Sequence, residues 1–326
     1  MPNPKVSVVI TAHNLESFIE EAIQSVLNQT YRDFEIIVVN NGSTDKTKEI
    51  IEKFYELYQD IKLINQENRG EGGGRNTGIR FSRGEFIAIM DGDDIWHKEK
   101  LELQVKALEE NPNAGLVSCF AAVIDNNSRL TGWRVGKNLN GNVFKNVSEV
   151  NGIPCGSAPL IRKYCFDKVG LFKEYLLVSD WDFFIRLSEY FPIITLPRIL
   201  VGYRRHSTNI SKNYDELECV SSAILDNLFK DKNRFTRSFS SKCYSGSKYI
   251  IAVLCTIDGE YDLAIKNLKK SFFLSPLSSF FQPDKVIFAL LLLSFKVFPL
   301  ATSWLINILH DMTGIKTNKE FKIVYG

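Results

Sequence analysis

The stretch Glu-Phe-Ile-Ala-Ile-Met-Asp-Gly-Asp-Asp-Ile-Trp, residues 85–96, decides the fold of this 326-residue chain. Its apolar run, 86–90, has the length of a buried strand and is too short for a typical helix. Three carboxylates, Asp91, Asp93 and Asp94, follow at once. Ligands of open α/β sheets bind where strands end, so this position favours a site for a hard divalent cation, Mg²⁺ or Mn²⁺, held by a few protein oxygens. The alternative is a solvated acidic turn that caps the following helix.

Short apolar runs and helical patterns alternate on both sides of this stretch. Strands are predicted over 6–10, 34–39, 61–64, 86–90 and 116–124, with an extended segment over 193–203. Helices are predicted from an N-cap at Asn14 to Leu27 and over 50–58, 76–82, 98–110 and 181–191, with a glycine-rich loop over 68–74 and loops with a short hairpin over 125–148. This alternation predicts an α/β fold with a doubly wound, mostly parallel sheet and right-handed crossovers.

Composition excludes several classes of protein. Apolar residues make up 44% and charged residues 24% of the chain, which is ordinary for a globular protein with a full core. A net charge of +2 gives no global field that would favour nucleic acid. The six cysteines contain no Cys-x-x-Cys pair, and the N-terminus lacks the pattern of a signal peptide. We therefore expect reduced thiols and a cytoplasmic protein.

The last third of the sequence differs from the rest. We place a boundary near Tyr214, which gives an α/β domain over 1–214 and a helical C-terminal region over 215–326. Between Lys230 and Lys296 there are eleven Lys/Arg and five Asp/Glu, a local charge of +6. The apolar segment 286–309 is about long enough to cross a bilayer, but a lysine and a proline near its middle favour two helices that lie on a membrane surface or pack on the domain over a spanning helix. Peripheral association with the inner face of the cell membrane is then expected, and a buried helical subdomain is the alternative.

Five separated motifs carry a resemblance to a known family. They are Val-Ser-Val-Val-Ile-Thr-Ala-His-Asn (6–14), Asn-Asn-Gly-Ser-Thr-Asp (40–45), Asn-Arg-Gly-Glu-Gly-Gly-Gly-Arg-Asn (68–76), Asp-Gly-Asp-Asp (91–94) and Ser-Asp-Trp-Asp (179–182). In this order the chain resembles the family 2 glycosyltransferases, with their GT-A fold, over about residues 5–212. The resemblance implies inverting transfer of a sugar from a nucleoside diphosphate sugar to an acceptor hydroxyl, with Mn²⁺ or Mg²⁺. It also implies a glycan or lipid-linked acceptor, as in bacterial-type surface polysaccharide or glycolipid assembly.

The resemblance assigns the nucleotide to the first two motifs. Thr11, Ala12, His13 and Asn14 leave the first strand where a nucleotide would sit. His13 matches a residue that is often a tyrosine stacked on uracil, although it can equally be a turn residue packed on the first helix. Asn41 matches an aspartate that accepts the uracil ring N–H. Asn40 and Asn41 replace both acids of the family's usual Asp-Asp pair. Uridine is still the expected nucleoside, with less support than the family pattern would give. A plain Asn-Gly turn is the alternative.

The third and fourth motifs would hold the diphosphate and the metal. Gly70 to Asn76 would offer backbone N–H groups, and the planar fork of Arg75 suits the nucleotide and its diphosphate. By resemblance, Asp91 faces the ribose and the metal, and Asp93 ligates the metal directly. Gly92 between them leaves room for the donor to approach closely. Asp94 is expected to cap the next helix.

The last motif would supply the base. Asp180 matches the family's catalytic base, and Ser179 stands where the family usually has a glutamate. Asp182 is the competing carboxylate and is interpreted as helix N-terminal charge, while simple capping is the alternative for both. His206 matches a position that in many relatives ligates the metal or contacts the diphosphate, although a lone histidine is as often structural.

Two other functions fit the sequence less well. A sugar nucleotidyltransferase would carry a glycine-rich phosphate loop directly after the first strand, where this chain has Thr11-Ala-His-Asn14. A non-catalytic nucleotide-sugar-binding protein would be signalled by loss of Asp91, Asp93 or Asp180, and all three are present.

Overall fold

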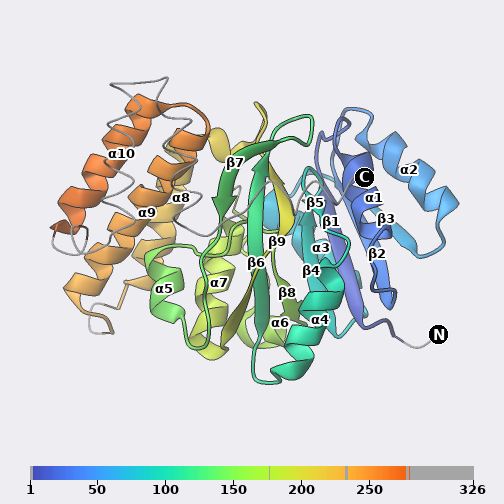
Figure 1. Ribbon diagram of the computed structural model, residues 1–326, viewed down its shortest axis with the longest axis horizontal. Helices are drawn as coiled ribbons and strands as arrows, with labels where there is room; N and C mark the ends of the chain where they lie inside the picture. Colours follow the sequence, from blue (N-terminus) through green and yellow to red (C-terminus); the bar gives the residue numbers. More distant parts are fainter. Residues whose placement is uncertain (1–2, 176, 232–233, 277–278, 280–326) are drawn as a thin grey trace. The chain divides into compact units, whose positions relative to one another are not determined.

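The computed structural model describes residues 3–175, 177–231, 234–276 and 279 (Figure 1). The chain forms two compact units. The first comprises Met1–Val147 and Gly152–His206, and the second Ser148–Asn151 and Ser207–Gly326. This division falls close to the domain boundary expected near Tyr214, which itself stays a prediction.

One mixed sheet organises the first unit. Within the described residues nine strands form it: β1 (Val6–Ala12), β2 (Phe34–Asn41), β3 (Ile61–Gln66), β4 (Phe86–Asp91), β5 (Ile95–Trp96), β6 (Leu116–Ile124), β7 (Leu130–Val135), β8 (Leu160–Arg162) and β9 (Ile193–Arg204). The order is β3-β2-β1-β4-β8-β6-β9-β5, and β7 pairs with β6. Strands β3, β2, β1 and β4 are parallel, as are β6 and β9, whereas β8 runs antiparallel to both of its neighbours. The predicted mostly parallel α/β sheet is confirmed.

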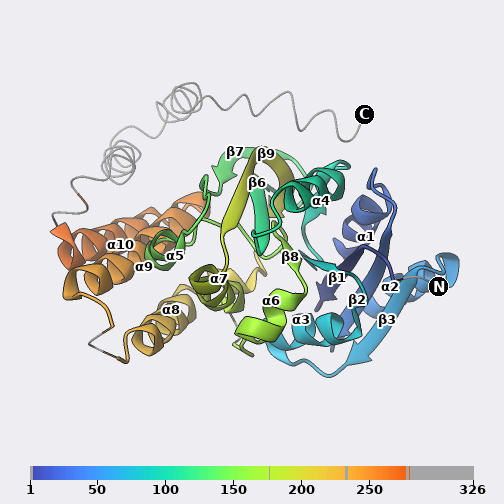
Figure 2. The same ribbon diagram turned by 90° about the horizontal axis from the view of Figure 1, so that it is seen from below.

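Helices cover both faces of this sheet. They are α1 (Ile19–Leu27), α2 (Thr47–Leu57), α3 (Gly70–Phe81), α4 (Lys100–Glu110), α6 (Tyr164–Val169) and α7 (Ser179–Tyr190). The chain also forms the short helix α5 (Phe144–Glu149). Helices α1 and α4 lie on one face, and α3, α6 and α7 on the other (Figure 2). Because both faces are covered, β1 and β4 read as continuous apolar runs that are almost wholly buried. The strand order reverses between β1 and β4, which makes their carboxyl ends the expected ligand crevice.

The predicted N-cap at Asn14 is wrong. Helix α1 begins five residues later, at Ile19, and Asn14 adopts a left-handed backbone with φ 54°. Its side chain instead ties two turns together, because its Oδ1 accepts from the backbone N–H of Thr44 at 2.8 Å. The short polar side chain of asparagine tolerates this conformation better than most residues.

The predicted glycine-rich loop over 68–74 is also wrong, since α3 already begins at Gly70. The glycines permit close packing of this helix. A Cβ on Gly72 would lie 2.1 Å from the carbonyl oxygen of Lys173, and one on Gly78 would lie 2.2 Å from Cγ1 of Val9. Glycine is unfavourable inside a helix, and here tertiary packing overrides that propensity.

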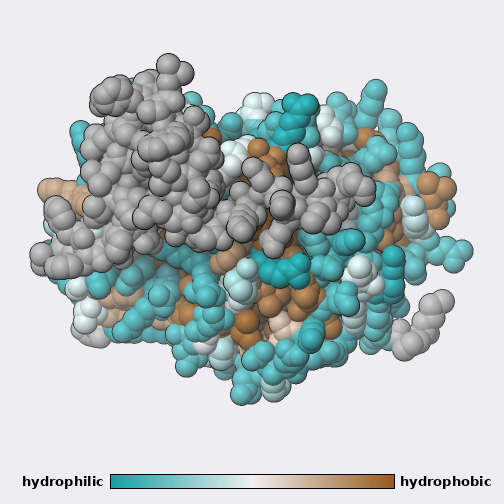
Figure 3. Space-filling view, in the orientation of Figure 1, coloured by the Kyte–Doolittle hydropathy of each residue, from teal (hydrophilic) through white to brown (hydrophobic). Residues whose placement is uncertain are grey.

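The second unit is helical in its described part. It contains the short 3-10 helix η1 (Ile210–Lys212), then α8 (Tyr214–Leu228), α9 (Arg237–Ile257) and α10 (Tyr261–Leu274). Helices α9 and α10 pack closely, and Ser245 and Ser271 form hydrogen bonds between them. No helix among the described residues is long and apolar enough to cross a membrane. The expectation for 286–309 lies outside the described residues. In the view of Figure 3 the described surface is mostly hydrophilic, with hydrophobic residues in smaller groups.

Candidate active site

Strand register assembles the predicted nucleotide residues at one edge of the sheet. Thr11 lies beside Asp91 in the β1–β4 ladder, and Ala12 lies beside Asn40 in the β1–β2 ladder. The backbone N–H of Gly92 donates to the carbonyl oxygen of Thr11 at 2.9 Å. A Cβ on Gly92 would lie 2.9 Å from that same oxygen, so only glycine fits this turn without a shift. The first and fourth motifs thus meet where the strand order reverses.

A directional chain of side-chain hydrogen bonds crosses the end of β2. The Gln66 amide donates to Oδ1 of Asn41 at 2.7 Å, and Nδ2 of Asn41 donates to Oδ1 of Asn68 at 3.3 Å and to the carbonyl oxygen of Gly70 at 3.0 Å. Oδ1 of Asn41 also accepts from the backbone N–H of Arg69 at 3.1 Å. The carboxamide of Asn41 is therefore occupied within the protein, and it braces the start of α3.

His13 ends this chain of hydrogen bonds. Its Nδ1 lies 3.0 Å from the carbonyl oxygen of Asn41, and its Nε2 lies 3.3 Å from Nδ2 of Asn68. A carbonyl only accepts and an amide nitrogen only donates, so Nδ1 carries the proton and Nε2 accepts. The half-buried imidazole is held in one orientation beside the carboxyl ends of β1 and β2. Stacking of this ring on a base stays a prediction.

Arg75 joins the metal motif to the predicted base. Its side chain is fully buried, and Nη2 lies 2.7 Å from Oδ1 of Asp91 and 2.5 Å from Oε1 of Glu71. Nη1 donates to Oγ of Ser179 at 3.2 Å, directly before Asp180. A single guanidinium thus connects β4, α3 and α7. The predicted contact of Arg75 with a diphosphate stays a prediction.

Burial and mutual charge interactions shift the pKa values of Arg75 and of the acids around it. Burial would lower the pKa of Arg75, but Asp91, Glu71 and Asp180 together raise it above its usual value. Burial raises the pKa of Glu71 to about 8, with Arg75 opposing and Asp180 and Asp91 adding to the shift. Burial also raises the pKa of Asp180, again against the pull of Arg75 and with a contribution from Asp91. A carboxylate with a raised pKa is a better proton acceptor.

The segment Cys155–Ser157 covers this cluster and was missed by the sequence analysis. The Ser157 hydroxyl accepts from the backbone N–H of Asp91 at 2.9 Å. A Cβ on Gly156 would lie 2.3 Å from Nη2 of Arg75 and 3.0 Å from Oδ2 of Asp91. Glycine is the only residue type at position 156 that leaves Arg75 and Asp91 in place. A lone Gly-Ser pair carries no sequence signal for such a role.

Asp180 and Asp182 lie in different surroundings, although both stand in the first turn of α7. Asp182 is buried and pairs with Arg186, one turn later, at 2.7 Å. Asp180 is half-buried beside Arg75 and Asp91. The helix is entered through Val178, a β-branched residue at φ 49°, a conformation such residues rarely adopt. The interpretation of Asp182 as helix N-terminal charge fits its structural role.

The other half of the Asp-x-Asp motif meets the end of β9. Oδ2 of Asp93 lies 3.0 Å from Nε2 of His206, and both side chains are largely buried. Asp94 does not cap the next helix, because α4 begins at Lys100 behind Glu99. Instead Asp94 is buried, and its Oδ1 accepts from the backbone N–H of Arg204 at 2.9 Å. Burial, followed by Asp93 and Asp91, raises the pKa of Asp94 well above its usual value.

The donor set suits a hard divalent cation that keeps further ligands for substrate. Asp91 and Asp93 present carboxylates from one turn, and their side chains retain 27% and 16% exposure. Among the described residues no group of three or more acidic, histidine or cysteine side chains forms a ready metal cluster. Two carboxylates completed by phosphate oxygens and water are an arrangement that Mg²⁺ commonly adopts. Asp91 and Asp93 therefore fit such an ion, with His206 beside the second of them.

Comparison with known proteins gives the class and then the family. Solved structures with the same fold include S. aureus TarS 1-349 in complex with UDP-GlcNAc (16% identity, TM-score 0.56, covering 90% of this chain and 87% of that one). Another is the mannosyltransferase PcManGT from Pyrobaculum calidifontis in complex with GDP-Man and Mn²⁺ (18% identity, TM-score 0.56, covering 93% and 88%). These structures share the fold of this chain, and the sequence matches place it in the class of glycosyltransferases.

Residues 7–170 match the family described as glycosyl transferase family 2. An uncharacterized glycosyltransferase of Haemophilus influenzae is 32% identical over 224 residues, which cover 65% of this chain and 69% of the relative. One of Methanocaldococcus jannaschii is 28% identical, covering 72% and 83%. A Rickettsia bellii relative is 34% identical, but the match spans only 24% of that protein. The chain belongs to glycosyl transferase family 2, as the five motifs predicted.

Proposed function

We propose that the chain transfers a sugar, with inversion, from a nucleoside diphosphate sugar to a hydroxyl group of a glycan or lipid-linked acceptor. UDP-sugar is the first donor to test, and surface polysaccharide or glycolipid assembly is the expected setting. The observation that supports this most strongly is the guanidinium of Arg75, which contacts Asp91 and Ser179 and so joins the metal motif to the predicted base.

Inverting transfer requires one in-line displacement at the anomeric carbon. The leaving diphosphate is a weak base, so the residues around it need only stabilise growing negative charge. Mn²⁺ or Mg²⁺ held by Asp91 and Asp93 would supply part of that stabilisation. The half-buried Asp180 takes the proton of the acceptor hydroxyl, and its raised pKa suits that role. Asp182 is already paired with Arg186 and is poorly placed to act as the base.

A donor panel tests the reaction. TarS has been solved with UDP-GlcNAc and PcManGT with GDP-Man and Mn²⁺, so UDP- and GDP-linked sugars both belong in the panel. Release of nucleoside diphosphate is measured with Mn²⁺, with Mg²⁺ and with EDTA. We expect release from at least one donor that depends on the metal. Release that EDTA leaves unchanged would refute the metal role. Absence of nucleoside diphosphate release with every donor and acceptor would refute the proposed enzymatic function.

Two isosteric variants identify the base. Asp180→Asn removes basicity and keeps size, so kcat should fall by roughly 10²- to 10⁴-fold, the usual range for a general base, with little change in donor affinity. Asp182→Asn weakens the pair with Arg186, so thermal stability should fall while turnover by the folded enzyme persists. The opposite pattern, with turnover lost only in Asp182→Asn, would show that the wrong carboxylate was chosen.

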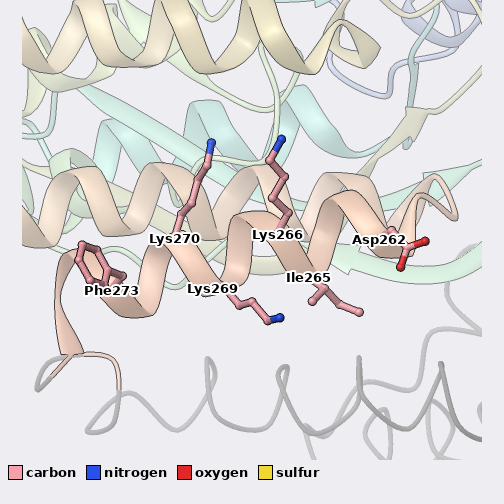
Figure 4. A pocket seen from close by; sticks show the side chains of 6 residues that line it. All are labelled: Asp262, Ile265, Lys266, Lys269, Lys270 and Phe273. Carbon is pink, nitrogen blue, oxygen red and sulfur yellow. The ribbon is translucent and has the colours of Figure 1, made fainter.

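For the second unit we propose contact with an anionic membrane surface. A groove of about 640 Å³ runs along α10 and is lined by Asp262, Ile265, Lys266, Lys269, Lys270 and Phe273 (Figure 4). Lys266 and Lys269 are exposed, and Phe273 is 86% exposed, so this face offers positive charge beside an apolar ring. Such a face complements anionic lipid headgroups.

Vesicle flotation of the full chain tests the membrane contact. With vesicles of phosphatidylglycerol and phosphatidylcholine, we expect wild type to float with the vesicles and Lys266→Glu/Lys269→Glu to remain unbound in the bottom fraction. Lys48→Glu/Lys53→Glu on α2 changes charge equally and should float like wild type. Equal flotation of all three proteins, or none by wild type, would refute the proposal.

A further inference from the structure

We propose that Arg204 is the positioning residue of the metal loop, residues 91–94: it holds the backbone carbonyl of Asp93 and the carboxylate of Asp94, so that the carboxylate of Asp93 is held ready for the cation. The inference rests on the proposed function for the identity of the ligand. The hydrogen bonds of Arg204 to the metal loop exist in the protein without metal. The positioning role of Arg204 can therefore be tested separately from the proposed function.

Arg204 grips the loop through both its backbone and its side chain. It is the last residue of β9 and is fully buried. Its Nε donates to the carbonyl oxygen of Asp93 at 2.6 Å, and its backbone N–H donates to Oδ1 of Asp94 at 2.9 Å. Two consecutive residues of the loop are therefore bound to one residue of the neighbouring strand.

The rest of the guanidinium is anchored to two other segments. Nη2 donates to Oε2 of Glu21 on α1 at 2.6 Å, and Nη1 donates to the carbonyl oxygen of Asp125 at 2.9 Å. Both terminal nitrogens lie 3.1 Å from Oγ of Ser128. The guanidinium also lies 4.9 Å from the ring centre of Phe18. The planar fork with five donors satisfies all these acceptors, whereas lysine, with three donors, can replace it only in part.

The turn that Arg204 reaches is itself strained. Ser128 has φ 61°, in the left-handed region that non-glycine residues seldom adopt. Its hydroxyl lies 2.7 Å from each carboxylate oxygen of Glu21. Strain of this kind persists where the surroundings over-determine the conformation, and such places often serve function. Here Ser128 is held by Glu21 and Arg204, and Arg204 also holds the metal loop.

The end of β9 also reaches the carboxylate of Asp93. His206, two residues beyond Arg204, has its Nε2 3.0 Å from Oδ2 of Asp93, and its ring lies 4.8 Å from that of Phe18. Arg204 thus fixes the Asp93 backbone while His206 contacts its side chain. A ligand fixed before the metal arrives loses less conformational freedom on binding, which raises affinity.

The experiment compares Arg204→Gln and Arg204→Lys with wild type and with Arg198→Gln. Arg198 lies on the same strand, is 46% exposed and pairs with Glu99 at the surface, so it is a matched control. Hydrogen exchange of the metal-free proteins is followed in the segment 86–97. Free Mn²⁺ is then titrated by electron paramagnetic resonance in the presence of UDP and, separately, of GDP.

We expect faster exchange of the 91–94 amides in both Arg204 variants and unchanged exchange in Arg198→Gln. Mn²⁺ affinity should fall by roughly 10- to 100-fold in Arg204→Gln, the usual effect of losing a residue that orients a ligand, and less in Arg204→Lys. The loss should appear in KM for the donor at low Mn²⁺ more than in kcat at saturating Mn²⁺. Arg198→Gln should stay within about twofold of wild type.

Glu21→Gln keeps the test decisive if Arg204→Gln does not fold. Glu21 is 35% exposed, and its amide form retains shape while weakening the anchor of Arg204. Unchanged exchange of 91–94 in folded Arg204 and Glu21 variants would overturn the positioning role. Absence of Mn²⁺ binding by wild type would refute the proposed function instead, and exchange would still decide whether Arg204 holds the loop.

Discussion

Gly156→Ala should displace Arg75, although Gly156 itself is not predicted to contact the donor. The added Cβ would lie 2.3 Å from Nη2 of Arg75, about an ångström inside ordinary contact, and 3.0 Å from Oδ2 of Asp91. The end of a flexible side chain normally yields to such a contact. Arg75 cannot do so easily, because it is fully buried and held by Asp91, Glu71 and Ser179.

The size of the effect follows from the ion pair that must stretch. Breaking a buried pair by removing one partner costs about 3–5 kcal/mol, because a charge is left uncompensated. Here both partners remain and Asp91 is 27% exposed to water, so we expect about 1–3 kcal/mol. For a unit of this size that corresponds to a fall in Tm of roughly 2–12 °C. Turnover should fall at least about tenfold, because reacting groups shifted by an ångström lose much of their effective molarity.

Gly74→Ala is the matched control at the same site. Its Cβ would lie 3.4 Å from the Asn41 side chain and 3.5 Å from Cγ2 of Thr11, which is ordinary contact. Alanine favours the helix by up to about 1 kcal/mol, so this variant should be as stable as wild type or more so. Both variants are compared by thermal unfolding, calorimetric nucleotide binding and donor turnover. If Gly156→Ala is as stable and as active as wild type, Arg75 is not confined as described.

Two further outcomes follow from buried polar groups. Burial lowers the pKa of Lys100 to about 8, against 10.5 in an unfolded chain, so folding is penalised by about 3 kcal/mol below pH 8 and the penalty is relieved as pH rises towards 10.5. Lys100→Met should therefore be more stable than wild type near pH 7. The gain should be smaller than about 3 kcal/mol, since Gln104 loses a hydrogen bond. Denaturant titrations should show this advantage shrinking between pH 8 and 10.5, and a constant difference in stability would contradict the argument. Asn41→Asp places acceptors against the carbonyl oxygen of Gly70 and Oδ1 of Asn68, so the free energy of unfolding should fall by about 1–3 kcal/mol. The exposed Asn28→Asp keeps the oxygen that Gln24 uses and should change little, and equal stability of the two variants would refute the direction assigned to the Asn41 amide.

The fold was predictable because its signals are local and repeated. Strands β1, β2 and β4 are short runs of apolar residues, and the motifs at their carboxyl ends appear in sequence order. The errors arose where packing overrides local preference. Three consecutive glycines indicate a loop by propensity, yet they form part of α3 because Gly72 must pass close to the Lys173 carbonyl. Such a contact joins residues about a hundred positions apart and leaves no local pattern.

The candidate site shows the same division. The residues with unusual chemistry at strand ends, such as Asp91 and Asp93, were found because carboxylates after an apolar strand are conspicuous. Gly156, Ser157 and Arg204 were missed as functional candidates because their importance lies in what they support. Each acts through a hydrogen bond or close contact with a residue more than sixty positions away, and no spacing rule encodes such a pairing.

The charge balance around Arg75 links the structure to the proposed reaction. Glu71, Asp91 and Asp180 surround a single guanidinium, so a fully ionised cluster would carry excess negative charge in a largely buried place. The protein relieves this by raising the pKa of Glu71 to about 8 and that of Asp180 above its usual value, chiefly through burial. A divalent cation at Asp91 would remove part of the repulsion between Asp91 and Asp180. Because Arg75 contacts Asp91 and lowers the pKa of Asp180 against the effect of burial, disturbing the guanidinium should impair donor binding and proton transfer together if the proposed reaction holds.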